Sequence, residues 1–454
     1  MTIELLAPID LAFWHLESAD HPMHLGALAF FTAVRGTAGG AGVLELLAAR
    51  AAAIPRLRMR VRDVLLPVGG SAWAVDKGFD VLRHVRWLPL PDGDFAAEAT
   101  RAAGELMERP LERGIPPWEM YVLTPEGETA EDADEDGRPF AVLVKLHHAL
   151  ADGMRAVTIG AGIFDQIADA RAAGVHRVRP VPPRSWLPGP WQVADLAMAR
   201  IVELGRAVGI GASVVRASRL DPRGTPALTA GSSGTRRLAT AVLDLEDVQR
   251  IRRAVGGTAN DVLLATVAGA LRRWMLARGE RLPVTAPRAL VPVSRRSPGS
   301  PPGSGNKLSA YLLALPVTEP DPRARLAAVH GNMARNKSGG PSRGAGAVAV
   351  LADQLPAFAH RLAAPLAGSA ARMLFDILVT SVPLPRSTLS LGGCPLREVY
   401  PMAPLARGQS LAVALSTYGG RVHVGLVADG KAVPDLERLA RAMTDELEEL
   451  LRVI

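Results

Sequence analysis

The chain of 454 residues is long enough for two domains, and its 48% hydrophobic and 21% charged residues indicate a globular protein. A single cysteine, Cys394, excludes an internal disulfide framework and a cysteine-rich zinc site, and it fits a reducing cytoplasmic compartment. The net charge of +7 does not favour nucleic acid as a partner, because only 4% of the residues are aromatic and no nucleic-acid-binding motif occurs.

The N-terminal segment predicts neither a signal peptide nor a membrane span. It carries acidic residues early, with no basic region before an apolar run, and the chain has no stretch of about 18 apolar residues. Peripheral contact with a bilayer stays open, because residues 177–253 hold thirteen Arg and six acids. Such a basic stretch can attract lipid headgroups or phosphates, and it is equally typical of a solvated surface.

The first half of the chain alternates strand and helix patterns. Residues 140–147 form an apolar run of strand length, and residues 153–170 show the helical spacing of apolar side chains. Two stretches rich in proline or glycine then flank residues 191–219, whose spacing predicts a connecting helix. We therefore divide the chain into an N-terminal half (1–180), a linker with the connecting helix (181–234) and a C-terminal half (235–454).

The second half continues the alternation. Thr258 suits the N-cap of a helix, and Asp261 follows three residues later, as in a capping box. Gly419-Gly420 predicts the turn of a hairpin over 411–428, and Pro434-Asp435 precedes a final amphipathic helix. Further strand-like runs cover 288–294, 308–317 and 376–382. This mixture of strands, helices and a hairpin predicts α/β domains with mixed sheets.

The segment His147-His148-Ala-Leu-Ala-Asp152-Gly153 is the strongest candidate site. An imidazole at the rigid end of a strand can take a proton from a hydroxyl and return it to a leaving group near neutral pH. Asp152 stands where the next helix begins, and Gly153 gives the backbone freedom there. Spacing alone also allows structural histidines and an Asp152 that only caps the helix, whereas no third ligand for a metal is suggested nearby.

With this motif, HHxxxDG, the whole chain resembles the bacterial wax ester synthase/diacylglycerol acyltransferase family, within the CoA-dependent acyltransferases. A colinear series of other segments carries the resemblance. These are PIDLAFWHLE at 8–17, HPMHLG at 21–26, PLERGIPPWE at 110–119, NDVLLA at 260–265, VPVS at 291–294, GNKLS at 305–309, Leu315-Pro316 and Pro434-Asp435. One segment departs from the family pattern: residues 380–385 read TSVPLP where the family usually has a sequence like SNVPGP.

The resemblance implies two chloramphenicol-acetyltransferase-like domains with an active-site tunnel at their interface. It implies that His148 is the general base, supported by His147, and that Asp152 is chiefly structural and pairs with an arginine. Asn260 and Asp261 are carried over as residues important for activity, with helix capping as an equal alternative for Asp261. The remaining motif positions expected to place substrate are Pro116, Trp118, Pro292 and Ser294.

The implied activity is transfer of a long-chain acyl group from acyl-CoA, as co-substrate, to diacylglycerol, a fatty alcohol or both. No metal or other cofactor is expected. The products would be triacylglycerol and wax esters, made by a cytoplasmic protein that meets lipid at the inner membrane face or at lipid droplets. Two alternatives stay open: a non-catalytic lipid-binding relative, motivated by the altered segment 380–385, and an acyltransferase for a different hydrophobic alcohol.

Overall fold

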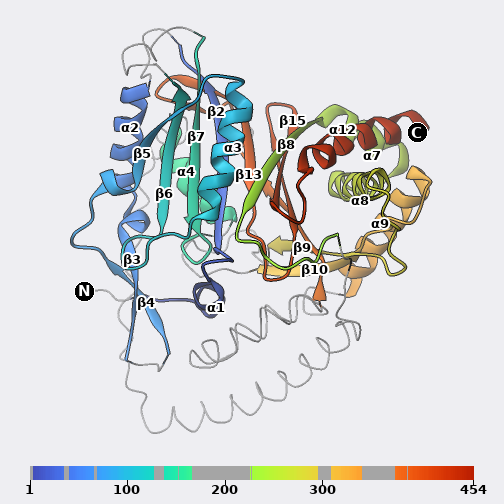
Figure 1. Ribbon diagram of the computed structural model, residues 1–454, viewed down its shortest axis with the longest axis horizontal. Coiled ribbons are helices and arrows are strands. Elements are labelled where there is room, and N and C mark those ends of the chain that lie inside the picture. Colours follow the sequence, from blue (N-terminus) through green and yellow to red (C-terminus); the bar gives the residue numbers. More distant parts are fainter. Residues whose placement is uncertain are drawn as a thin grey trace.

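A computed structural model describes residues 4–34, 40–65, 69–126, 137–151, 153–165, 225, 227–294, 308–339, 374–385 and 387–454. The connecting helix expected at 191–219 and most of the linker lie outside these residues. In Figure 1 two sheets stand side by side, each with helices on its outer side.

The first sheet has six strands in the order β12-β13-β2-β7-β6-β5, and a small sheet, β1-β4-β3, lies beside it. The strands and helices of the N-terminal half are β1 (Glu4–Leu5), α1 (Pro8–Leu16), β2 (His24–Thr32), α2 (Gly40–Ala53), β3 (Met59–Asp63), β4 (Ser71–Val75), β5 (Val85–Leu90), α3 (Phe95–Glu108), β6 (Trp118–Pro125), β7 (Pro139–His147) and α4 (Gly153–Ile163), with short 3-10 turns at Pro55–Arg58 and Val81–Arg83. Apolar side chains cover both faces of β2 and β7, which places these strands at the centre of the half.

The second sheet also has six strands, in the order β10-β9-β11-β14-β15-β8. The elements after the linker are β8 (Arg236–Asp244), α7 (Leu245–Val255), α8 (Ala259–Ala277), β9 (Arg288–Ser294), β10 (Leu308–Ala314), α9 (Pro322–Gly339), β11 (Ile377–Pro383), β12 (Ser390–Leu391), β13 (Cys394–Met402), β14 (Leu411–Tyr418), β15 (Arg421–Asp429) and α12 (Leu436–Val453). Helix α8 is buried almost all round, because α7, α9 and α12 pack against it. This helix layer and one face of the sheet form the core of the half.

Strands β12 and β13 cross from the C-terminal half into the first sheet, where β13 pairs antiparallel with β2. A third apolar cluster then joins α3, β2, β13 and the second sheet. The two sheets pack tightly at Gly425 of β15, where an added Cβ would lie 1.9 Å from the carbonyl oxygen of Pro401 on β13. The two halves therefore share an apolar cluster, although the linker separates them in sequence.

Most of the expected elements are present. Strand β7 and strand β9 match the predicted runs, and the Thr258–Asp261 capping box opens α8. The hairpin turn has positive φ at both Gly419 and Gly420, as a two-residue turn between twisted strands requires. These signals each lie within a few neighbouring residues, so the sequence predicts the elements that the structure shows.

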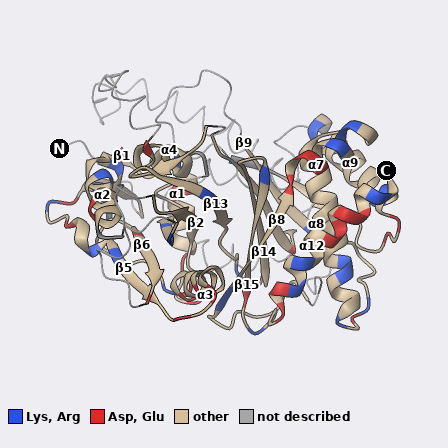
Figure 2. Cartoon of the chain, turned by 90° about the horizontal axis from the view of Figure 1, so that it is seen from above, with Lys and Arg blue, Asp and Glu red and all other residues tan. Residues whose placement is uncertain are grey.

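No single described helix is long and apolar enough to cross a membrane; α7 and α8 reach that length and composition only as a pair bent by 104°. Acidic and basic residues are interspersed on α7 and α12, whereas α9 carries basic residues and no acidic one (Figure 2). In the described part of the basic stretch 177–253, Arg250 pairs with Asp247 and Arg253 with Glu246. Residues 177–224 and 226 of that stretch lie outside the described residues.

Candidate active site

The turn after β7 presents the two histidines in opposite directions. The carbonyl oxygen of His147 accepts hydrogen bonds from the backbone N–H groups of Leu150 and Ala151, at 2.8 and 3.3 Å, which closes a helical turn directly after the strand. The N–H of His147 donates to Pro117, and that of His148 donates to Met23 at 2.8 Å. The backbone is thus held on both sides, which sets the point from which each imidazole leaves the turn.

His147 points into the protein and is fully buried. Its Nδ1 accepts a hydrogen bond from the N–H of Ala149 at 3.0 Å, so the ring proton is on Nε2, which faces the Glu17 carboxylate at 3.5 Å. Burial alone would raise the pKa of Glu17, but His147, Arg113 and the N–H of Met23 outweigh it and hold that pKa below its usual value. This geometry suits a residue that positions the turn.

Two buried donors hold strands β2 and β7 in place near His147. His24 of β2, directly opposite His147, donates from Nε2 to the carbonyl oxygen of Met107 at 2.8 Å. Lys145 of β7 donates to Leu106 and Arg109 and lies 3.4 Å from Glu119. Burial, with the nearby Lys145 charge, holds the pKa of His24 well below its usual value. The neutral imidazole and the ammonium group thus satisfy carbonyls at the C-terminal end of α3.

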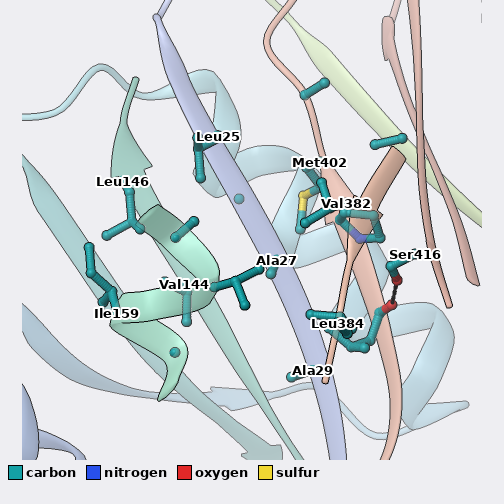
Figure 3. Close-up of a pocket in the computed structure, with 18 of the residues that line it drawn as sticks. Leu25, Ala27, Ala29, Val144, Leu146, Ile159, Val382, Leu384, Met402 and Ser416 are labelled. Atoms are coloured by element: carbon teal, nitrogen blue, oxygen red, sulfur yellow. Dashed lines mark hydrogen bonds between the residues drawn. The ribbon is translucent and has the colours of Figure 1, made fainter. Parts of the chain in front are cut away.

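His148 points the other way, into a cavity of about 460 Å³ between the first sheet, α4 and β11. Its ring stacks on Phe13 of α1, with ring centroids 3.9 Å apart and an angle of 23° between planes. Apolar side chains make up most of the wall, several of them from β2, β7 and β11 (Figure 3). His148 is the only titratable side chain among the described residues that line this cavity. An imidazole in such a place can act on a hydroxyl in surroundings that contain little water.

Two family models match this chain. The wax ester synthase/diacylglycerol acyltransferase catalytic domain matches residues 6–263, and the C-terminal domain of the same family matches residues 304–451. The chain belongs to the wax ester synthase/diacylglycerol acyltransferase family. The expected family and its acyltransferase class are thereby confirmed.

Relatives of known name agree with this family. The chain is 30% identical to the Mycobacterium tuberculosis protein named "Probable diacyglycerol O-acyltransferase tgs1", over 99% of this chain and 96% of that one. The protein named tgs2 from the same species is also 30% identical, with each chain fully covered.

Solved structures show the same fold. The wax ester synthase/diacylglycerol acyltransferase from Marinobacter aquaeolei VT8 has a TM-score of 0.69 at 24% identity, with 98% of each chain covered. The TRI3 trichothecene 15-O-acetyltransferase from Fusarium sporotrichioides has a TM-score of 0.66 at 11% identity, covering 99% of this chain and 95% of that one. The expectation of two acyltransferase-like domains with mixed sheets is confirmed.

The altered segment of this family member lies at the cavity. Thr380, Val382, Leu384 and Pro385 line it, so the departure from the family pattern lies in the wall of the cavity that His148 enters. The hydroxyl of Ser416 on the neighbouring strand β14 donates to Val399 at 3.0 Å (Figure 3). Apart from His148, the hydroxyl side chains that line the cavity belong to the second sheet: Thr380, Ser381 and Ser416.

The other predicted site residues lie in different parts of the structure. Pro292 of β9 lines the cavity with His148. Pro116 and Trp118 are buried in the core beside β7, where the indole N–H donates to the carbonyl oxygen of Leu57 at 2.6 Å. Ser294 ends β9, and Gly153 begins α4. Asp152 lies outside the described residues, so its arginine partner stays a prediction.

Asp261 is a capping residue in this structure. Its carboxylate accepts from the backbone N–H of Thr258 at 2.9 Å, and the Thr258 hydroxyl accepts from the N–H of Asp261 at 3.2 Å. The same carboxylate lies 3.0 Å from Nδ1 of His330 on α9. Neither Asp261 nor Asn260 lines the cavity. The contacts of Asp261 thus favour the capping alternative, and the expected roles of both residues in activity stay predictions.

Two supporting residues had no assigned role in the sequence interpretation. Phe13 stacks on His148, and Glu17 faces His147. Both belong to the N-terminal motif at 8–17, so the motif marked them, but only the folded structure shows that α1 packs under the histidine turn. Among the described residues, no group of three His, Cys, Asp or Glu side chains could hold a metal ion.

Proposed function

We propose that this protein moves a long-chain acyl group from acyl-CoA to a hydrophobic alcohol, with His148 as general base. The acceptor would be diacylglycerol, giving triacylglycerol, or a fatty alcohol, giving a wax ester. One observation carries the proposal: the His148 imidazole is the titratable side chain in the wall of a largely apolar cavity between the halves. Family membership and the named relatives support the choice of acyl acceptors.

The reaction needs no covalent enzyme intermediate. His148 removes the proton of the acceptor hydroxyl as its oxygen attacks the thioester carbonyl carbon. The new carbon–oxygen bond gives a tetrahedral oxyanion, which collapses as the carbon–sulfur bond breaks. The CoA thiolate leaves and takes from the imidazolium the proton that came from the alcohol, so protons and charge balance. Stacking on Phe13 holds the ring through both transfers. The hydrogen bond from the backbone N–H of His148 to the carbonyl oxygen of Met23 holds the residue that carries the ring.

We propose that lipid substrates enter from a surface, at the inner membrane face or at a lipid droplet, while acyl-CoA arrives from the cytoplasm. The largely apolar wall of the cavity supports this, because a long alkyl chain gains free energy on leaving water there. The basic stretch 177–253 is a candidate contact for anionic headgroups.

Substitution of His148 tests the proposal. His148→Ala should lower kcat for CoA release from palmitoyl-CoA with dioleoylglycerol or hexadecanol by about 10²–10⁴-fold, as loss of a general base does. A thiol-reactive dye follows CoA, and thin-layer chromatography follows the ester. The matched control is His330→Ala, because His330 is exposed on α9 and does not line the cavity.

Two results would count against the proposal. Near wild-type turnover in His148→Ala would remove this residue as the base. Absence of ester formation by the wild type with every acyl-CoA and alcohol, while lipid still binds, would instead support a non-catalytic lipid-binding protein.

A further inference from the structure

The cavity has a direction, because two structural elements extend along it away from His148. Strand β2 begins beside His148, since His24 is paired with His147. From there Leu25, Ala27, Ala29 and Phe31 turn successive side chains toward the cavity. The six residue steps from Leu25 to Phe31 span about 20 Å in an antiparallel strand, so β2 forms a wall of that length. Figure 3 shows Leu25, Ala27 and Ala29 in sequence along it.

Helix α4 forms a second wall and runs in the same direction. It begins just after the histidine turn, and Ala156, Ile159, Gly160 and Ile163 line the cavity along its length. Eleven helical residues advance about 16 Å, which carries the chain from the turn to Phe164. The two walls therefore begin at the same end, next to His148.

The walls meet at an aromatic pair that closes the far end. The rings of Phe31 and Phe164 lie 6.2 Å apart between centroids, and Phe31 is 2% exposed. Leu389 and Leu391, each 1% exposed, also line this cavity and pack in the same apolar cluster. The cavity thus has a polar end at His148 and an apolar end at Phe31 and Phe164.

Asp165 holds the far end closed. Its carboxylate accepts from the hydroxyl of Ser390 at 2.7 Å and from the N–H groups of Gly392 and Gly393 at 3.1 and 2.9 Å. Arg50 of α2 pairs with the same carboxylate at 2.7 Å. Phe164 is therefore tied to β12, a strand contributed by the other half of the chain.

We infer that this cavity is a measuring channel for a linear alkyl chain, with Phe164 and Gly160 setting the longest chain that fits. This inference rests on the proposed function, because the reacting group must lie at His148 while the tail points to Phe164. Among the described lining residues, no other titratable group could meet a charged substrate within the channel. The alkyl chain belongs to the acyl donor or to the alcohol, and the experiment separates these two sources.

Two substitutions should change the chain-length preference in opposite directions. Phe164→Ala opens the closed end, so chains longer than the wild-type optimum should gain roughly 4-fold in kcat/KM per additional buried methylene. Gly160→Leu fills the channel beside Phe164 and should move the optimum to shorter chains by a similar factor. An added Cβ at Gly160 meets the Phe164 ring at 3.6 Å, an ordinary contact, and leucine favours helix, so this variant should fold.

The assay has two arms. One varies the acyl-CoA from octanoyl to icosanoyl with hexadecanol fixed, and the other varies the alcohol over the same lengths with palmitoyl-CoA fixed. A shift in one arm alone assigns the channel to that substrate. The matched control is Thr158→Leu, on the exposed face of the same helix, which should leave both profiles unchanged.

Failure of the channel can be distinguished from failure of the enzyme proposal. If both variants form ester through His148 and both length profiles match the wild type, the channel assignment is wrong while the activity stands. If the wild type makes no ester, calorimetric binding of the same acyl-CoA and alcohol series replaces turnover as the readout. If both variants then bind each chain length as the wild type does, the inference is wrong.

Discussion

At the scale of single residues, neighbouring identical side chains have different environments. His148 stacks on Phe13 at the cavity, whereas His147 is buried against Glu17 and holds the turn. The HHxxxDG pattern predicted the pair and assigned the base to the second histidine. It could not distinguish the two environments, because these depend on α1, which is more than a hundred residues away in sequence.

Asp261 offers a residue-scale test of capping against catalysis. Asp261→Asn and Thr258→Ala each weaken the capping box, so each should lower the free energy of unfolding by about 1 kcal/mol. Both should retain kcat/KM within about 3-fold, a change of well under 1 kcal/mol in transition-state binding. Chemical denaturation and the CoA-release assay measure the two quantities on the same samples. A loss of kcat beyond 100-fold in Asp261→Asn, with unchanged stability, would show that the family motif acts directly in the reaction.

At the scale of elements, the position of α4 depends on contacts at both of its ends. Its start follows the histidine turn, and the residue after its last turn, Asp165, is bound by β12 and by α2. Burial alone would raise the pKa of Asp165, but hydrogen bonds from Ser390, Gly393 and Gly392 and the charge of Arg50 hold that pKa below its usual value. The carboxylate therefore stabilises the folded state mainly in its ionised form.

This lowered pKa predicts acid sensitivity of the α4–β12 connection. The stabilisation is fully present above the ordinary aspartate pKa of about 3.9 and is lost as pH falls through the lower folded value. Asp165→Asn should remove about 1–3 kcal/mol at pH 7 and should flatten the decline of stability below about pH 4. Urea denaturation across this pH range measures it. The exposed pair of Asp247 supplies a control, since Asp247→Asn should change stability by less than about 1 kcal/mol. An unchanged acid decline in Asp165→Asn would contradict the prediction.

At the scale of the whole molecule, the two halves are joined by strands rather than by surface contact alone. β13 extends the first sheet while β14 returns to the second, so β2 has no free edge. The order of the strands along the chain predicted two α/β halves, but the crossover of β12 and β13 is a long-range pairing without a local signal. The crossover places Leu389, Leu391 and Val399 in the wall of the cavity.

Gly425 tests how tightly this junction is packed. Gly425→Ala places a Cβ against the backbone oxygen of Pro401, which cannot move aside as a flexible side chain would. We expect a loss of about 1–3 kcal/mol of unfolding free energy. Activity should also fall, because Pro401 of β13 lines the cavity. The matched control is Gly331→Ala within α9, where the new methyl group meets only the end of Arg335 at 3.6 Å. That control should be neutral or stabilising by about 0.5–1 kcal/mol. Equal effects of both substitutions would mean that β15 and β13 do not approach so closely.

The sequence by itself determined the family, the strand before the histidines, the capping of α8 and the glycine turn of the last hairpin. Each of these signals lies within a few neighbouring residues, so each can be interpreted without the fold. The tertiary structure decided which histidine faces the cavity, where the altered segment 380–385 lies and where the channel ends. These depend on contacts between residues far apart in the chain, because packing across the two sheets, and not local preference, sets the direction of a buried side chain.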